Sequence, residues 1–204
     1  MVKLMVFNRD EEYIGDVSNL ISANQSIELN GEDFITFETL DNNIEKGYRI
    51  LYHDRKVDRF YEYIVQEKNE YKEGNVVVND IYAENSLAET VGDFIEDKRS
   101  INQRVGHAVE RALEPTRWNI GEVYDNQELG TVTFYRTNAR AAINDIVEEW
   151  QLELKTEITW DAKAKKIRRK LHFLNYIGEF RGNRLTYTRD ILEIKRKTLP
   201  RTIS

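Results

Sequence analysis

The sequence predicts a β-rich α+β protein in which a barrel-like β domain carries an inserted αββαββ domain. Residues 1–98 contain a series of short segments with alternating apolar and polar side chains, each followed by turn residues. Residues 99–175 show two helical patterns, each followed by two strand patterns. Tyrosine is abundant, at 11 residues, and there are only 2 prolines, which favours strands over disordered linkers. Residues 176–204 are expected to form a return strand that completes the barrel, or to begin a further domain.

The first helix of the insert is expected to begin at Ser100. Ser100 and Gln103 have the spacing of a capping box, in which each side chain accepts a hydrogen bond from the other residue's backbone amide. The apolar residues that follow at steps of three and four would form one face, namely Ile101, Val105, Ala108, Val109 and Ala112. Pro115 is expected to end this helix, because the residue before a proline is disfavoured in helical conformation.

The second helix has the clearer pattern. Thr137 or Asn138 can cap its first turn. Its core positions are small or apolar throughout: Ala139, Ala142, Ile143, Ile146, Val147 and Trp150. An alternating run then predicts a half-buried strand with Leu152, Leu154, Ile158 and Trp160 on the inner side. After a turn at Asp161–Lys166, a returning strand carries Ile167, Leu171 and Phe173.

Two more strands are expected between the helices, at Arg117–Val123 and Thr131–Tyr135. In the first of them, Trp118 and Ile120 are expected to face the same side. Two helices covering one face of a small antiparallel sheet would bury all these apolar stripes together. We therefore expect one shared core that contains Trp118, Ile146, Trp150 and Leu154.

The first 98 residues are expected to form a barrel or a sandwich. The predicted strands are Leu4–Phe7, Tyr13–Gly15, Ser26–Leu29, Phe34–Leu40, Tyr48–Tyr52, Phe60–Gln66 and Val76–Tyr82. Turns are expected at Asn30-Gly31, His53–Asp58 and Asn69–Asn75. Strands of this length, with turns at such short intervals, are typical of barrels and sandwiches. Arg184–Lys197 is the further strand that could return to this domain.

Composition restricts the classes of protein to consider. The chain has no cysteine, which excludes disulfides and thiolate metal sites. No apolar run has the length of a membrane span, and the N-terminus lacks the pattern of a signal peptide. We therefore expect synthesis and folding in a cytoplasm, with no membrane span.

Charge is distributed unevenly along the chain. Acidic side chains dominate residues 1–102, whereas residues 103–204 carry a net positive charge. The strongest basic run is Lys163, Lys165, Lys166, Arg168, Arg169 and Lys170. It is consistent with a solvated hairpin or with a patch that binds phosphates or a protein partner. The charge asymmetry is consistent with chance or with electrostatic polarity along an assembly axis.

No segment carries a catalytic motif. His53, His107 and His172 lack metal-ligand spacing, and the serines Ser18, Ser22, Ser26 and Ser86 lack a nucleophile-elbow context. The acidic pair Glu148-Glu149 and the group Asp93, Glu96 and Asp97 are expected to be solvated charge. We therefore assign no catalytic, cofactor-binding or metal site and no cofactor, and we expect the chain not to be an enzyme.

Four stretches together resemble one family. They are a strand step at Asn43–Ile50, the segment LEPTRWNIG at Leu113–Gly121, the helix-to-strand run Thr137–Leu154, and the glycine loop and basic strand at Gly178–Arg196. In these the chain resembles the N-terminal hub region of siphophage tail-tip proteins, the tail-associated lysin or prophage endopeptidase tail family. That region is similar to the baseplate hub protein of contractile-tailed phages, and the likeness covers nearly the whole chain.

The resemblance implies a structural role. It implies a homotrimeric hub at the virion tail tip that closes the tail tube and links it to the host-recognition apparatus. The implied partners are the distal tail protein ring and the tape measure protein, with DNA passing through the lumen unbound. We expect the acidic 1–98 domain to line that lumen, and the basic segments 163–170 and 189–197 to face neighbours or the exterior. Assembly is expected in the bacterial host cytoplasm.

Two other functions stay open at this point. In the resembling family, peptidoglycan cleavage belongs to a separate C-terminal domain, which here would lie beyond residue 204, so the chain could be the N-terminal part of a tail-associated peptidoglycan hydrolase. The chain could alternatively bind nucleic acid, if the basic residues of 163–170 and 189–197 formed one stripe.

Overall fold

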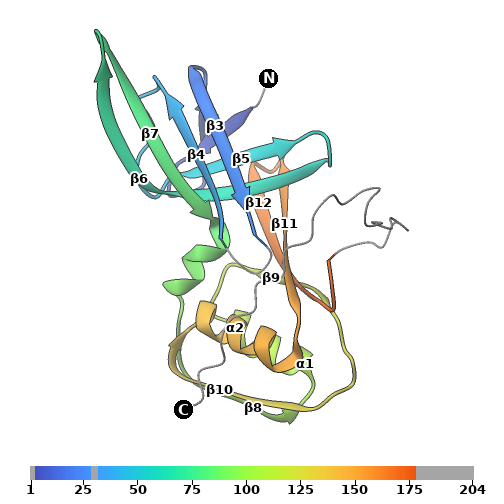
Figure 1. Ribbon diagram of the computed structural model, residues 1–204. Helices are drawn as coiled ribbons and strands as arrows, with labels where there is room; N and C mark the ends of the chain where they lie inside the picture. The colour runs from blue at the N-terminus through green and yellow to red at the C-terminus, as the bar shows by residue number, and fades with distance from the viewer. Residues whose placement is uncertain (1–2, 29–31, 178–204) are drawn as a thin grey trace, which may run out of the picture.

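A computed structural model describes residues 3–28 and 32–177. Its N-terminal part consists of strands β1 (Leu4–Phe7), β2 (Tyr13–Asp16), β3 (Leu20–Ile27), β4 (Asp33–Thr39), β5 (Arg49–Asp54), β6 (Arg59–Glu73) and β7 (Val76–Asn85). These strands form the upper part of the molecule in Figure 1, and the long β6–β7 hairpin extends beyond the others. The β-rich fold class expected from the sequence is confirmed.

The N-terminal strands follow one another in a closed circuit, which we call the barrel. β1 pairs with β5, β5 with β6, β6 with β7, β7 with β4, and β4 with β3. β2 pairs with β1 and leads into β3 after three residues, so the two act as one bent strand that closes the circuit. The interior holds an apolar cluster that includes Leu4, Phe37, Ile50, Tyr63 and Ile81.

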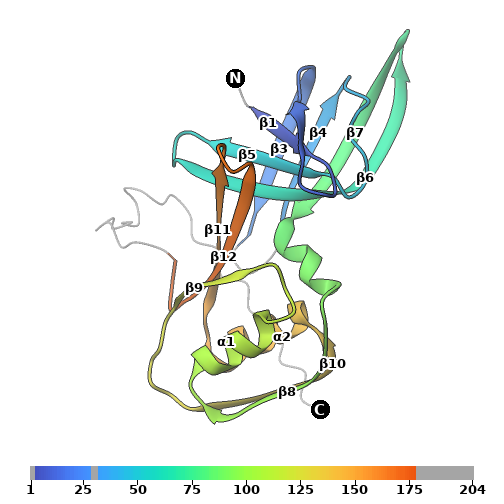
Figure 2. The same cartoon turned by 180° about the vertical axis from the view of Figure 1, so that it is seen from behind.

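The rest of the described chain, which we call the helical module, lies below the barrel in Figures 1 and 2. It consists of the 3₁₀ helix η1 (Ser86–Val91), β8 (Phe94–Gln103), α1 (Val105–Leu113), β9 (Asn119–Val123), β10 (Gly130–Asn138), α2 (Ala139–Trp150), β11 (Glu153–Asp161) and β12 (Lys166–Leu174). β8 and β10 form a two-stranded ribbon on the far side of the helices from the barrel. β11 pairs with β12 and, at Ile158, with Phe60 of β6, which connects the module to the barrel.

The core of the module is the one predicted from the helical stripes. Trp118, Ile146 and Trp150 are buried in one cluster, and Leu154 packs against it as a partly buried side chain. The predicted cap of α2 is also confirmed, because the Asn138 side chain accepts a hydrogen bond from the Ala141 amide at 2.9 Å. These features depend on local spacing, which explains why the sequence indicated them.

The predicted start of the first helix is wrong. Strand β8 continues through Ser100 to Gln103, and α1 begins at Val105 without a side-chain cap. Ser100 is paired with Val132 of β10, so its backbone is held by the ribbon instead of a helical turn. Ile101, which the helical pattern placed inside, is 57% exposed. Pairing with Val132, 32 residues further along the chain, overrides a local capping signal here.

The predicted single small sheet is also wrong. The helices do not cover one antiparallel sheet, because β8 and β10 form a ribbon of their own while β9, β11 and β12 belong to the large sheet. β9 runs parallel to β12. Trp118 lies just before β9 and is buried, whereas Ile120 is 42% exposed, so these two side chains do not share the inner face.

Two boundaries in the barrel differ from the prediction. β3 begins at Leu20, well before Ser26. The expected loop at Asn69–Asn75 is mostly strand, because β6 reaches Glu73 and the turn narrows to Gly74 and Asn75. Gly74 has a φ of 61°, a left-handed conformation that glycine adopts without strain.

Two sequence predictions concern residues that the structure does not describe. The Asn30-Gly31 turn and the strand at Arg184–Lys197 lie outside the described residues. The predicted boundary between residues 98 and 99 falls within β8. That the 176–204 segment completes the barrel remains a prediction.

Candidate functional site

The most heavily buried charges lie where the barrel meets the helical module. Glu62 of β6 has a fully buried side chain, and it lies between Arg49 of β5 and Arg169 of β12. Arg169 donates to both carboxylate oxygens of Glu62, from Nε to Oε2 and from Nη2 to Oε1, each at 2.6 Å. Arg49 Nη1 donates to Glu62 Oε1 at 3.2 Å. One carboxylate thus connects adjacent barrel strands to a strand of the module.

Three further side chains complete this group, which we call the seam network. Glu11, in the turn between β1 and β2, accepts from Arg169 Nη2 at 2.8 Å and from Arg117 Nη1 at 3.0 Å. Glu89 of η1 accepts from Arg49 Nη2 at 2.7 Å. The seam network therefore has three carboxylates and three guanidiniums, and it brings together segments from residue 11 to residue 169.

The electrostatics of the seam network favour the charged forms of Glu11 and Arg169. Burial by itself raises the pKa of Glu11, but the nearby charges of Arg169, Arg49 and Arg117 outweigh burial and hold that pKa below its usual value. Burial lowers the pKa of Arg169, yet the hydrogen bonds and charge of Glu62 and the charge of Glu11 raise it above the ordinary range. Glu11 and Arg169 therefore form a fixed ion pair near neutral pH.

The sequence alone did not indicate this network, because Arg169 stands within the basic run at residues 163–170. Strand alternation nevertheless places its side chain on the same face as Ile167 and Leu171. Its side chain is only 4% exposed. Alternation was the available signal, but nothing local identifies Glu62, 107 residues earlier, as its partner.

The three histidines lie in separate places. His53 pairs with Asp58 at 2.9 Å in the β5–β6 turn and stacks on Phe60. His107 of α1 bonds to Ser100 Oγ at 2.9 Å. His172 Nδ1 accepts from the Glu122 amide at 3.0 Å, so its Nε2 carries the proton toward Glu157. Within residues 3–28 and 32–177, no group of three or more potential ligands could hold a metal ion.

Several of the candidate acids and serines have structural partners. Glu149 accepts a hydrogen bond from the Thr131 amide at 3.0 Å, and Ser18 binds Asp41. Ser22 donates to Glu38 at 2.9 Å, whereas Ser86 is buried in η1. Burial, together with the charge of Glu89, raises the pKa of Asp93. The structure does not bring these groups together with a histidine.

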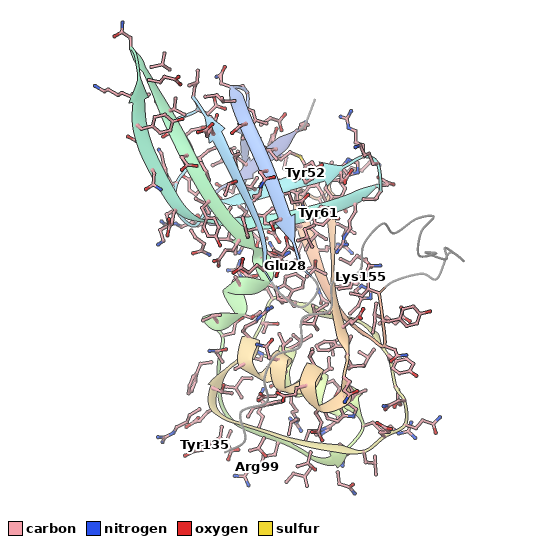
Figure 3. The ribbon with its side chains drawn as sticks, in the orientation of Figure 1. Glu28, Tyr52, Tyr61, Arg99, Tyr135 and Lys155 are labelled. Carbon is pink, nitrogen blue, oxygen red and sulfur yellow. The ribbon has the colours of Figure 1, made fainter. Side chains whose placement is uncertain are left out.

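A groove of about 470 Å³ separates the barrel from α2 and β11. Glu28, Tyr61 and Lys155, labelled in Figure 3, lie along it. Arg59 crosses it, with its guanidinium over the Tyr61 ring at 4.7 Å and a hydrogen bond to the Thr156 carbonyl at 2.6 Å. Arg59 thus bridges the groove between the barrel and the helical module.

The basic run is divided by the structure. Lys163, Lys165, Lys166 and Arg168 are exposed around the β11–β12 turn, and Lys170 pairs with Glu157 at 3.1 Å. Arg169 points inward to the seam network. Within the described chain, no helix is both long and apolar enough to cross a membrane.

Comparison with solved structures identifies the fold. The prophage tail protein gp18 from Listeria monocytogenes EGD-e superposes with a TM-score of 0.60 at 12% identity, over 84% of this chain and 50% of that protein. The tail protein from Neisseria meningitidis MC58 gives a TM-score of 0.56 at 11% identity, over 84% of this chain and 50% of its own. The chain thus spans about half the length of these proteins. The expected resemblance to phage tail proteins is confirmed at the level of the fold.

Comparison of the amino-acid sequence alone identifies no related protein. No protein-family profile matches the chain, and no curated protein is significantly similar to it in sequence.

Proposed function

We propose that this chain is a structural subunit of a phage or prophage tail tip, of the baseplate-hub type. The observation that carries the proposal is the fold shared with two prophage or tail proteins over 84% of the chain. The arrangement of charges supports a structural role, because the buried ion pairs of the seam network hold two regions together.

In this role the chain would form a homotrimer that closes the tail tube and contacts the distal tail protein ring and the tape measure protein. DNA would pass through the lumen without specific binding. The acidic barrel suits such a wall, because carboxylates repel phosphates whereas lysine and arginine bind them strongly. The described part of the basic run supports this view, since Arg169 and Lys170 already have carboxylate partners and cannot join a continuous phosphate-binding stripe.

The direct test is location in the particle. An antibody against this chain, applied to tailed particles induced from the host of the gene, should label one end of the tail by immunoelectron microscopy. Labelling of heads, or of no particle at all, would overturn the proposal. A structure of the assembled tail tip tests the finer claim, which fails if residues 163–170 line the channel or if the chain makes no threefold contacts.

The absence of enzymatic activity has its own test. Purified protein incubated with cell walls in a zymogram should produce no clearing, since the sequence carries no catalytic motif and the three histidines lie in separate places. Cleavage that survives purification and disappears on substitution of a single acidic residue would favour the hydrolase instead.

A further inference from the structure

A polar cleft of about 660 Å³ opens beside the seam network. Its walls come from three separate segments: the β1–β2 turn, the residues before β9 and the start of β12. We call it the basic cleft, because its walls carry Arg9, Arg117, Lys166 and Arg168. The tail function proposed above assigns no role to this surface.

The cations of the basic cleft are only partly neutralised. Among the described residues, Lys166 and Arg168 have no ion-pair partner, and Arg9 is held by the neutral carbonyl of Lys46 at 2.8 Å. Arg117 shares Glu11 with the buried Arg169, so that carboxylate is already fully engaged. Asp10 is the other acid in the wall. A surplus of fixed positive charge therefore faces the cleft and favours an anionic occupant.

The backbone of the cleft suits an extended occupant. β12 begins at Lys166, but its pairing with β9 begins only at Lys170, so among the described strands its first four residues have a neighbour, β11, on one side only. Asn119 Nδ2 donates to the Arg169 carbonyl at 3.1 Å, immediately before the pairing of β12 with β9 begins. A strand with one free side can accept a further extended segment.

The spacing of the cations fits alternate residues of such a segment. Lys166 and Arg168 are two residues apart on β12, so their side chains leave the same face about 7 Å from each other. Carboxylates at alternate positions of an extended peptide have the same repeat. A long polyanion fits less well, because its line of phosphates would continue past the two cations to Asp10 and Glu12 at the adjoining turn, whereas two alternate carboxylates need reach only Lys166 and Arg168.

We propose that the basic cleft binds an acidic, extended segment of a partner protein. The inference does not depend on the tail function, because it concerns binding by the isolated chain. Its failure and the failure of the proposed function are therefore distinguishable: one is read from peptide binding, the other from the location of the chain in particles.

The test uses the full 204-residue chain and a fluorescein-labelled peptide of alternating glutamate and serine, followed by fluorescence anisotropy. The peptide should bind, and its glutamine counterpart should not. The double variant Lys166→Glu/Arg168→Glu should weaken binding about tenfold or more, as expected for the reversal of two ion pairs. The matched variant Lys72→Glu/Arg99→Glu makes the same change in net charge at positions outside the basic cleft. Lys72 lies on the β6–β7 hairpin, and Arg99 lies on β8 at the lower end of the molecule in Figure 3. This variant should bind the peptide nearly as the wild type does.

As a control, circular dichroism and thermal unfolding should show that both double variants are folded. Three outcomes would overturn the proposal: no binding of the acidic peptide, equal weakening by both double variants, or tighter cleft-dependent binding of a double-stranded DNA fragment than of the peptide. The second outcome would show an effect of net charge alone, and the third would identify a nucleic-acid site.

Discussion

The barrel and the helical module have cores of different kinds. The barrel interior is lined by strands and by Ile44 of the β4–β5 loop, and it admits polar groups, such as Tyr63, whose hydroxyl donates to Asp33 at 2.9 Å and accepts from Gln25 at 2.6 Å. The module core is built from two helices against strands, with small residues such as Ala108, Ala139 and Ala142 where the elements approach closely. A closed set of strands leaves its side chains to fill the interior, whereas helices pack by bringing small residues into contact.

The difference is greatest where the two regions meet. The barrel interior has its own apolar cluster, whereas the module cluster also includes Phe7 of β1 and Leu51 of β5, and Glu62, Arg49 and Arg169 are buried where the two regions meet. Buried ion pairs contribute little net stability, because desolvation offsets most of the attraction, but breaking one is costly. We infer that the seam network specifies how the module sits on the barrel, while the two apolar clusters supply most of the stability.

The largest effects should come from matched truncations, one in each core. Phe134→Ala in the module and Phe37→Ala in the barrel both remove a ring that is at most 1% exposed, and each should lower the free energy of unfolding by about 3–5 kcal/mol. Urea denaturation measures the loss. Hydrogen exchange then shows whether the regions unfold together: because the seam network couples them, Phe134→Ala should also reduce protection of barrel amides. Unchanged protection in the barrel would mean that the two cores are independent.

A comparable loss is expected from the seam itself. Glu62→Gln removes the fully buried carboxylate shared by Arg49 and Arg169 and should cost about 3–5 kcal/mol, because the two buried guanidiniums keep only the more exposed Glu11 and Glu89 as charged partners. Glu157→Gln is the matched control: its pair with Lys170 is exposed, and its loss should cost less than about 1 kcal/mol.

The seam has a second, sharper test. The triple variant Arg49→Met/Glu62→Leu/Arg169→Met should recover most of the stability that Glu62→Gln loses, as apolar groups replace the buried charges. If the triple variant were less stable than Glu62→Gln, the seam network would be contributing net stability, and the division of roles inferred above would be wrong.

The pH dependence should distinguish the seam from the barrel. The pKa of Glu11 is lowered in the folded state, so its stabilisation is present above the unfolded pKa and is lost as the pH falls below about 4.5. The pKa of Asp33 is raised by burial, against the hydrogen bonds from Tyr63 and Asn85, so its contribution is full below pH 3.8 and is lost as the pH rises. Thermal unfolding between pH 3 and 7 should show a shallower acid-side fall for Glu11→Gln and a steeper one for Asp33→Asn. Identical profiles in both variants would contradict these assignments.

The smallest effect concerns two glycines of the module. Gly106 lies in α1 with open space around its missing Cβ, so Gly106→Ala should stabilise the protein by about 0.5–1 kcal/mol. Gly130 differs, because a Cβ there would lie 2.4 Å from the Trp150 ring, and Gly130→Ala should destabilise by about 1–3 kcal/mol. Differential scanning calorimetry of the two variants should give shifts of opposite sign. A stabilising Gly130→Ala would mean that the Trp150 ring is free to move aside.

Much of the fold could be predicted from local pattern. The α2 face and its Asn138 cap, the β11–β12 hairpin and most barrel strands follow from spacing alone. The candidate site could not be predicted in this way. The basic run at residues 163–170 suggested one exposed patch, whereas the structure assigns its members to a turn, a surface pair and a buried network.

By itself, the sequence determined which segments are amphipathic and with what period, because side-chain direction repeats every two residues in a strand and every 3.6 in a helix. Only the tertiary structure decided what each face meets. Ser100 had the spacing of a helix cap, but Val132 of β10 holds it in a strand. Arg169 belonged to a charged run, but Glu62 and Glu11 draw it inward and leave Lys166 and Arg168 to form the basic cleft. The physical reason is common to both: a backbone or a charge is satisfied by whichever partner the fold brings near, and sequence distance does not reveal that partner.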